Sequence, residues 1–158
     1  MLDILVRTAT LEDLDILMEF ELGILGAERP FDPTLKDGEL RTHDLTALVT
    51  ASNSEVVIGV VDEQPIGCGY AQIRDALDYL KHLQYAHVGL IYVKPEFRGN
   101  GVTRAMIGVL GEWILSMGVH EMRLEVYHDN VKARRAYEKA GFAPHMLSMR
   151  MDLRDDSL

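Results

Sequence analysis

The segment that most constrains the fold is an apolar run, residues 88–93, followed by a glycine-flanked loop and a long helical pattern. The run predicts a buried strand, and Gly99 and Gly101 lie where the loop meets the helix. Gly118 is expected to end that helix. The first N–H groups of a helix have no intrahelical partner, and glycines let an anion approach the backbone. This strand–loop–helix unit therefore predicts a binding site for a phosphate-bearing ligand.

The remaining periodicities predict a single α/β domain over residues 1–158. Strands are expected at residues 4–8, 55–61, 65–73, 84–93 and 121–127, with a last hairpin from 142–144 and 147–153. Helices are expected at residues 10–26, 39–51, 102–118 and 130–141. The short turn 62–64 predicts an antiparallel hairpin, and the step from 84–93 to 121–127 predicts parallel pairing with a right-handed crossover. The expected fold class is a mixed, mostly antiparallel sheet of about seven strands flanked by about four helices.

The composition limits the class of protein. Among 158 residues the formal net charge is −9, which argues against the clustered Lys and Arg of a nucleic-acid binder. The acidic balance is compatible with a cationic or amine substrate. No run approaches the ~18 apolar residues of a membrane helix, and the N-terminus lacks the pattern of a secretory signal. The single cysteine, Cys68, precludes an internal disulfide, so we expect a cytoplasmic protein without nucleic-acid or membrane partners.

Two common phosphate-binding motifs fit the loop poorly. Gly99 and Gly101 match the start of G-x-G-x-x-G, but Arg104 stands where the third glycine belongs. A P-loop is excluded because the chain has no Gly-Lys-Ser/Thr. A third pattern fits better, since residues 98–102, RGNGV, resemble the R/Q-x-x-G-x-G/A motif of the GNAT N-acetyltransferase superfamily. Residues 130–142, NVKARRAYEKAGF, are similar to the same family's N-x-x-A-x-x-x-Y-E-K-x-G-F signature.

The resemblance implies the GNAT fold, acetyl-CoA as the co-substrate and direct transfer of acetyl to a primary amine. In this family the motif loop wraps the pyrophosphate of CoA with backbone N–H groups, and the preceding strand binds the pantetheine and the acetyl oxygen. Carried over, the cofactor-binding residues are Ile91, Tyr92, Val93, Arg98, Gly99, Asn100, Gly101, Val102, Thr103, Asn130, Ala133 and Tyr137. Asn130 can also cap the following helix. Thr103 departs from the family's Gly or Ala, and its side chain either crowds the phosphate or donates a hydrogen bond to it.

Two side chains are candidates for the chemistry. The resemblance implies that Tyr137 is the acid that protonates the leaving thiolate; the alternative is a tyrosine that packs on the core face of its helix. His87 is the candidate base, because imidazole titrates near pH 6.5. Alternation predicts that His87 lies on the same side of its strand as Gly89, Ile91 and Val93. The alternative for His87 is a histidine whose ring is satisfied in the core or at an edge.

The acceptor pocket is expected to be built by residues 26–38 and the end of the strand 65–73. There Arg29 is expected to grip a substrate carboxylate, with Phe31 as an aromatic neighbour. Glu28 or Asp32 is expected to attract an ammonium. The alternative for each of these residues is a solvated loop with a salt bridge. No metal is predicted, because the histidines and the cysteine show no ligand spacing.

These features predict an acetyltransferase that acts on a small-molecule amine, such as an amino acid-like metabolite. Two alternatives stay open. One is a protein acetyltransferase acting on a lysine or an N-terminus, which a shallow, open acidic groove would favour. The other is a CoA-binding regulatory module without turnover, since a fold does not guarantee a function. A homodimer is a habit of the family that the sequence neither shows nor excludes.

Overall fold

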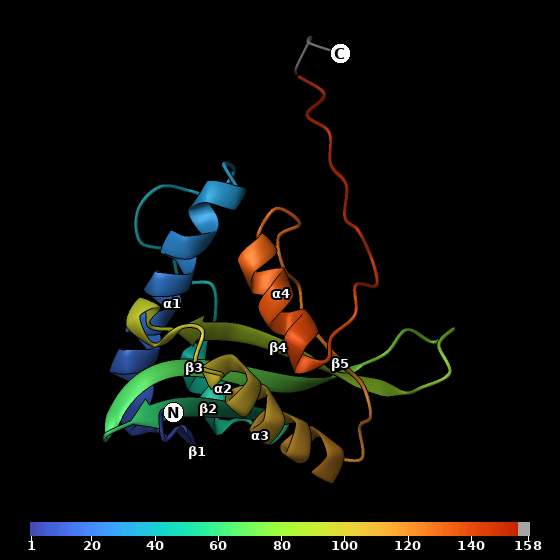
Figure 1. The fold of residues 1–158 in the computed structure, drawn as a ribbon. Helices are drawn as coiled ribbons and strands as arrows, with labels where there is room; N and C mark the ends of the chain where they lie inside the picture. Colours follow the sequence, from blue (N-terminus) through green and yellow to red (C-terminus); the bar gives the residue numbers. More distant parts are fainter. Residues whose placement is uncertain (155–158) are drawn as a thin grey trace.

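A five-stranded sheet with helices on both faces forms the described part of the chain, residues 1–154 of the computed structural model (Figure 1). The strands are β1 (Leu5–Thr8), β2 (Ser54–Val61), β3 (Gln64–Asp75), β4 (Gln84–Val93) and β5 (Met122–Arg123). The helices are α1 (Leu14–Glu28), α2 (Leu45–Thr50), α3 (Val102–Ser116) and α4 (Val131–Ala140). Three single turns of 3-10 helix join them: η1 (Leu11–Asp13), η2 (Arg29–Phe31) and η3 (Pro95–Phe97).

The strands follow one another across the sheet in chain order, β1-β2-β3-β4-β5. The first four pair antiparallel, so that Val57 of β2 faces Gly69 of β3. β5 is parallel to β4 and is reached through α3. The predicted hairpin and the predicted parallel step are both confirmed, because a short turn joins antiparallel neighbours whereas a parallel neighbour needs a crossover.

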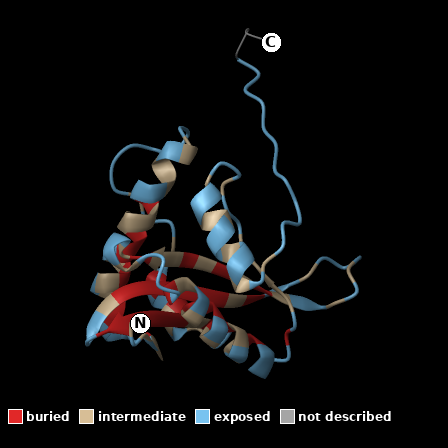
Figure 2. Ribbon diagram, viewed as in Figure 1, coloured by how far each residue is buried: buried red, intermediate tan, exposed pale blue. Residues whose placement is uncertain are grey.

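Alternation along β2 divides the apolar side chains between two cores. One core lies between the sheet and α3, and it includes Val57, Val88 and Leu110. The other lies under α1 and α2, and it includes Phe20 and Ile58. Figure 2 shows the sheet as the buried layer, with exposed residues on the outer surfaces of the helices. Since helices cover both faces of the sheet, its edge and the ends of its strands are the favoured places for a ligand.

β4 is irregular at Leu90, and the irregularity corrects one prediction. Leu90 has a φ of 54°, in the left-handed region, and the register between β3 and β4 shifts there. A bulge inserts one residue, so side chains after it change faces relative to those before it. His87 therefore lies with Tyr70 on the α1 and α2 side of the sheet, whereas Ile91 and Val93 pack in the α3 core. The common side predicted for His87, Ile91 and Val93 is wrong.

Cys68 lies on β3 next to this bulge and is fully buried. Its Sγ–H donates to the Leu90 carbonyl oxygen at 3.2 Å. Burial raises the pKa of the Cys68 thiol far above its ordinary value. The thiol therefore stays protonated and belongs to the core rather than to the chemistry.

The C-terminal segment also differs from the prediction. No strand forms in residues 141–154, so the hairpin expected from 142–144 and 147–153 is wrong, and the described sheet has five strands rather than about seven. The segment runs away from the sheet (Figure 1), and five of its large apolar side chains are exposed: Met146, Leu147, Met149, Met151 and Leu153. A strand needs a neighbour that offers free N–H and C=O groups, and β5 offers a stretch of only two residues.

Candidate active site

β4 and β5 pair briefly and then separate. Only Ala86 and His87 of β4 pair with β5, and the Ala86 N–H donates to the Glu121 carbonyl at 2.8 Å. Along residues 88–93, β3 pairs with one edge of β4, and within residues 1–154 no strand pairs with the other. Main-chain groups on that free edge can take a ligand in place of a strand. This edge includes residues 91–93, where the sequence predicts contacts to pantetheine.

The loop after η3 gives its backbone the form that an anion site needs. Gly99 and Gly101 have φ of 77° and 84°, in the left-handed region that favours glycine. An added Cβ would meet no atom within 4 Å at either position, so the requirement is one of conformation and not of space. α3 begins at Val102 with Gly101 as its N-cap, and no described side chain caps it. The first N–H groups of α3 are therefore open to a phosphate.

Two side chains of the loop fasten the loop itself. Arg98 Nε donates to the Val93 carbonyl at 2.8 Å, and its guanidinium lies 5.8 Å from the centre of the Tyr92 ring. Asn100 Nδ2 donates to the carbonyls of Phe97 and Arg98, each at 3.1 Å. These contacts fix the loop to the end of β4. An anion would therefore meet the main chain of the loop rather than these two side chains.

α4 contributes Asn130 and Tyr137. Asn130 Oδ1 accepts from the Ala133 N–H at 3.2 Å, which confirms the predicted cap. Tyr137 is half-buried, and its ring meets that of Phe142 edge-on with centroids 6.1 Å apart. Burial, with the charge of Glu28 adding, raises the pKa of Tyr137 to about 12. Tyr137 therefore keeps its proton at neutral pH, as a group that is to donate one must.

The segment after α1 packs against the connection from β5 to α4. Phe31 stacks on Tyr127 with ring centroids 6.3 Å apart, and the Tyr127 hydroxyl donates to Asp32 Oδ2 at 3.0 Å. Arg150 also donates to Asp32, at 3.1 Å. Hydrogen bonds from Thr34 above all, and then from Arg150, hold the pKa of Asp32 well below its ordinary value. Residues far apart in the sequence thus form one cluster of contacts, which includes the predicted acceptor residues Phe31 and Asp32.

Glu28 and Arg29 have different surroundings. Burial raises the pKa of Glu28, and the nearby His43 opposes that shift. Arg29 Nη1 donates to the Lys36 carbonyl at 2.8 Å, and its Nη2 donates to the Gly38 carbonyl. These bonds brace the loop that follows η2. They engage both terminal nitrogens of the guanidinium. A substrate carboxylate would therefore have to replace the loop carbonyls as the partner of Arg29, and the predicted binding of a carboxylate stays a prediction.

Tyr70 is the centre of a cluster that sequence reasoning missed. Its ring contacts those of both His43 and His87, at centroid distances of 5.4 and 6.0 Å. A Cβ added at Gly89 would come 3.0 Å from the Tyr70 hydroxyl, so this ring covers β4 next to the bulge. Burial, and then the charge of Arg74, lower the pKa of His87 below its ordinary 6.5. A tyrosine in a β-type run gives no local sign that two histidines will flank it.

A cavity of about 260 Å³ opens beside Tyr70. Its lining residues are Thr42, His43, Asp44, Ala47, Leu48, Ala51, Tyr70, Gln72 and Arg74. They come from the segment before α2, from α2 itself and from β3. The predicted acceptor residues of the segment 26–38 do not line it, so the cavity is a second candidate place for an acceptor.

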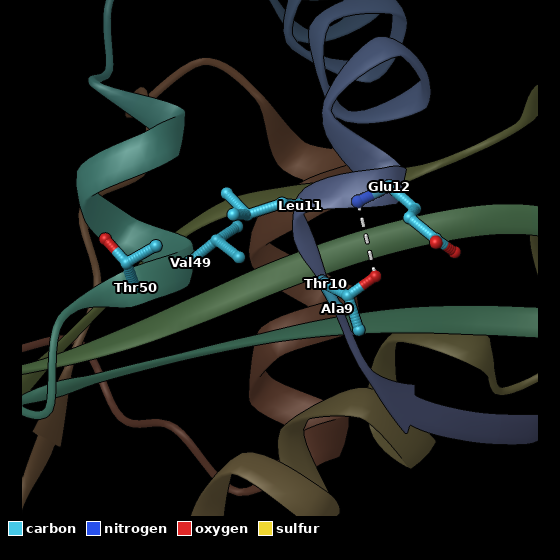
Figure 3. Close-up of a pocket in the computed structure, with 6 residues that line it drawn as sticks. All are labelled: Ala9, Thr10, Leu11, Glu12, Val49 and Thr50. Atoms are coloured by element: carbon cyan, nitrogen blue, oxygen red, sulfur yellow. Dashed lines mark hydrogen bonds between the residues drawn. The ribbon is translucent and has the colours of Figure 1, made fainter.

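A larger hollow, of about 510 Å³, lies against a different side of α2 (Figure 3). It is lined by Ala9, Thr10, Leu11, Glu12, Val49 and Thr50. The hydrogen bond drawn there, from the Glu12 N–H to Thr10 Oγ1 at 3.3 Å, belongs to the predicted cap at the start of the first helical segment. None of the predicted site residues lines this hollow, and we assign it no part in the site.

In residues 1–154 no three His, Cys, Asp or Glu side chains gather in a way that could hold a metal ion. The predicted absence of a metal stays a prediction. In that same part of the chain no helix combines the length and the apolar character needed to cross a membrane.

Comparison with known proteins agrees with this geometry. The model of the Acetyltransferase (GNAT) family matches residues 20–142, which is most of the chain. This chain therefore belongs to the GNAT acetyltransferase family. The free edge of β4, the loop 98–103 and the start of α4 all lie within the matched residues.

One relative and two solved structures are similar to part or most of this chain. Aminoglycoside N(6')-acetyltransferase type 1 from Stenotrophomonas maltophilia is 30% identical over 77 residues, which are 47% of this chain and 50% of that protein. The chain thus spans about half the length of this relative. The tetramutant of the BH1408 protein from Bacillus halodurans has a TM-score of 0.83 at 19% identity, covering 94% of this chain and 99% of that one. A predicted acetyltransferase from Clostridium acetobutylicum, solved with acetyl-CoA, has a TM-score of 0.72 at 17% identity, covering 98% and 99%. At these identities the two structures show a shared α/β fold.

Proposed function

We propose that this chain is an N-acetyltransferase that moves the acetyl group of acetyl-CoA directly to a primary amine on a small molecule. The observation that carries the proposal is the separation of β4 from β5 beside the open N-terminus of α3. One continuous stretch of chain thereby offers main-chain groups for a pantetheine arm and for a pyrophosphate. Family membership, shown over residues 20–142, supports the same assignment, and we propose one catalytic domain over residues 1–158.

The proposed cofactor contacts follow this stretch. The N–H groups of residues 98–103 would receive the pyrophosphate, with the Thr103 hydroxyl as a further donor. The main chain of residues 91–93 would bind the pantetheine, and a main-chain N–H at the bulge would polarise the thioester carbonyl. Asn130 and Ala133, at the start of α4, would contact the pantetheine from the side opposite β4. These contacts use backbone geometry that the loop and the bulge already have.

Tyr137 and His87 would move the protons of the transfer. The neutral amine attacks the thioester carbonyl carbon, a C–N bond forms and the C–S bond breaks. Tyr137 gives its proton to the leaving thiolate, and His87 takes the N–H proton that the new amide loses, directly or through water. Burial lowers the pKa of His87 and raises that of Tyr137 to about 12, so at neutral pH each starts in the required state. The proton on His87 then restores Tyr137 through solvent.

The proposed acceptor is a small cationic amine, such as an amino acid-like metabolite or an amino sugar. Glu28 and Asp32 put carboxylates on the acceptor side, and Phe31 supplies an aromatic surface there. Arg29 would reach a substrate carboxylate only if the loop gave up its bonds to that guanidinium. The similarity to a protein named as an aminoglycoside acetyltransferase supports a small-molecule amine. A homodimer, covering the exposed apolar residues of the segment 147–153, is part of the same proposal.

The deciding experiment measures acetyl-CoA binding and thiol release together, in wild type and in Tyr137→Phe. Acetyl-CoA is titrated by calorimetry, and free CoA is followed over a panel of amino acids, polyamines, aminoglycosides and peptides. We expect amine-dependent release by wild type. Tyr137→Phe should lower kcat by about 10²-fold or more while acetyl-CoA still binds, because a positioned acid is worth roughly that much.

Each outcome of this experiment separates two assignments. Release with peptides alone would favour the protein acetyltransferase over the small-molecule enzyme. Binding of acetyl-CoA without release for any amine would favour the regulatory module. No binding at all would contradict the assignment of the loop 98–103.

A further inference from the structure

Glu21 is a carboxylate buried on the face of α1 that packs against the sheet. Its side chain is 1% exposed. Oε2 accepts from the His43 N–H and from the Thr42 hydroxyl, each at 3.1 Å, and lies 3.1 Å from His43 Nδ1. Oε1 is buried without a hydrogen-bond partner among residues 1–154, and Arg41 Nη1 lies 3.9 Å from it. A buried carboxylate with one unpaired oxygen is rare in folded proteins and calls for an explanation.

A structural role explains only part of this arrangement. Glu21 ties residues 42–43 to α1, but the neutral amide of a glutamine would accept the same bonds from the His43 N–H and the Thr42 hydroxyl. Burying a charge that is incompletely paired lowers stability, and groups kept in that state cluster at functional sites. What a carboxylate adds over an amide is a negative charge beside an imidazole. The negative charge of Glu21 therefore suggests that the His43 imidazole has a chemical role.

Glu21 and Thr42 together hold the His43 ring. His43 Nδ1 lies 3.1 Å from Glu21 Oε2 and 2.8 Å from the Thr42 hydroxyl, which itself donates to Oε2. In the tautomer that donates Nδ1–H to these oxygens, Nε2 is the proton acceptor and lies on the opposite side of the ring. The His43 side chain is 27% exposed, lines the 260 Å³ cavity and meets the Tyr70 ring edge-on. Tyr70 in turn covers Gly89 next to the bulge of β4. His43 thus lies one aromatic ring away from the proposed position of the thioester.

Charged and titratable groups surround His43 from each packed element. They are Glu21 and Glu28 of α1, Arg41 and Asp44 of its own segment, Tyr70 and Arg74 of β3, and His87 of β4. The three carboxylates outnumber the two guanidinium groups. This balance suits a cavity that receives a protonated amine, because the carboxylates attract its charge before the proton leaves.

We propose that His43 takes the first proton from a protonated acceptor amine held in this cavity, and that Glu21 is its positioning residue. The inference rests on the proposed acetyl transfer. A cationic amine has to lose one proton before its nitrogen has a lone pair for attack. That proton goes to His43 Nε2 and from there to solvent. The second N–H proton leaves after the C–N bond forms and goes to His87, so two histidines serve the two deprotonations.

The test compares two acceptors of similar shape, one with an aliphatic amine that is protonated at pH 7 and one with an amine that is neutral there. The variants are His43→Gln and Glu21→Gln. His82→Gln is the matched control, because His82 Nε2 also lies near a carboxylate, 3.2 Å from Glu121 Oε2, but on the connection between β3 and β4. Melting temperature and the Kd for acetyl-CoA are measured for each, and both should stay close to wild type.

The expected result is selective for the charged acceptor. His43→Gln should lower kcat/KM for the cationic amine by about 10²-fold near pH 7, since a general base contributes roughly that much. The loss should shrink as pH rises and the free amine becomes abundant. The neutral amine should be nearly unaffected. Glu21→Gln should give the same pattern with a smaller loss, and His82→Gln should give none.

Three outcomes would overturn the proposal in different ways. Equal losses for both acceptors at every pH would mean that His43 has a structural role only. Wild-type turnover with full activity in His43→Gln would remove this inference and leave the acetyltransferase assignment standing. Wild type without amine-dependent release would remove both. If His43→Gln does not fold, the near-isosteric Glu21→Gln decides by the same comparison of acceptors.

Discussion

The proposed binding sites for the cofactor and for the acceptor amine, on either side of β4, would use different parts of the chain. On the proposed cofactor side, most of the groups would be main-chain groups from one continuous stretch, residues 91–103, and α4 would add Asn130, Ala133 and Tyr137. On the acceptor side, they are side chains from four separate segments: Glu21, Glu28, His43, Tyr70 and His87. A ligand that never changes can be recognised largely by the backbone, whereas side chains let acceptor choice vary without altering the fold. Substitutions on the two sides should therefore differ in what they damage.

The largest difference should come from the loop glycines. Gly101→Ala is expected to weaken acetyl-CoA binding by about 10-fold, because an L residue costs roughly 1–2 kcal/mol in the left-handed conformation and the loop would leave its present form. The KM for the acceptor should change little. Calorimetry with acetyl-CoA and steady-state kinetics measure the two effects.

Gly108→Ala is the matched control on the same helix. An added Cβ there meets no atom within 4 Å, and its φ is not in the left-handed region. Alanine should therefore leave acetyl-CoA binding unchanged and raise stability by about 0.4–1 kcal/mol. Equal effects of the two substitutions would contradict the conformational role given to Gly101.

A smaller effect is expected on the acceptor side, and it should appear in the acceptor KM rather than in the Kd for acetyl-CoA. Asp32→Asn should raise the acceptor KM by about 5-fold, because it weakens the charge-assisted bonds that Asp32 accepts from Tyr127 and Arg150. The Kd for acetyl-CoA should not change. Arg150→Ala, which removes an exposed partner, should do less. A weakened Kd for acetyl-CoA in Asp32→Asn would show that the two sides are not independent.

The smallest effect concerns stability against pH. The pKa of His87 is lowered in the folded chain, so folding is opposed by its protonation. The contribution of His87 is fully favourable above its ordinary pKa of 6.5 and is lost as pH falls below that value. Wild type should lose more Tm than His87→Gln between pH 7.5 and pH 5.5. If the two lose the same amount, burial does not penalise the charged imidazole.

The backbone structure on the proposed cofactor side could be predicted from the sequence because its signals are local. The hairpin of β2 and β3 follows from a short turn, and the loop at 98–103 follows from two glycines between a strand and a helix. The Asn130 cap is equally local, since its partner is three residues away. In each case the residues that determine the structure are the residues that form it.

The acceptor side could not be predicted to the same extent, because its contacts join distant residues. Glu21 interrupts an apolar helical face, and its partner His43 lies 22 residues further on. The bulge at Leu90 changes which side chains share a face with His87. A leucine seldom adopts the left-handed conformation, so the sequence does not predict the bulge. Alternation in residues 147–153 predicts a strand, but a strand also needs a neighbour, and no local pattern supplies one.

The burial of Cys68 makes the chain convenient to study. It is the only cysteine in the sequence, and its sulfur is enclosed in the core. A chromogenic reagent that couples to thiols would therefore ignore the folded protein and report each CoA as it is released. The same reagent would label the protein only when the core opens, at one sulfur per molecule. One dye could then count turnovers on the scale of seconds and unfolding events on a much longer one.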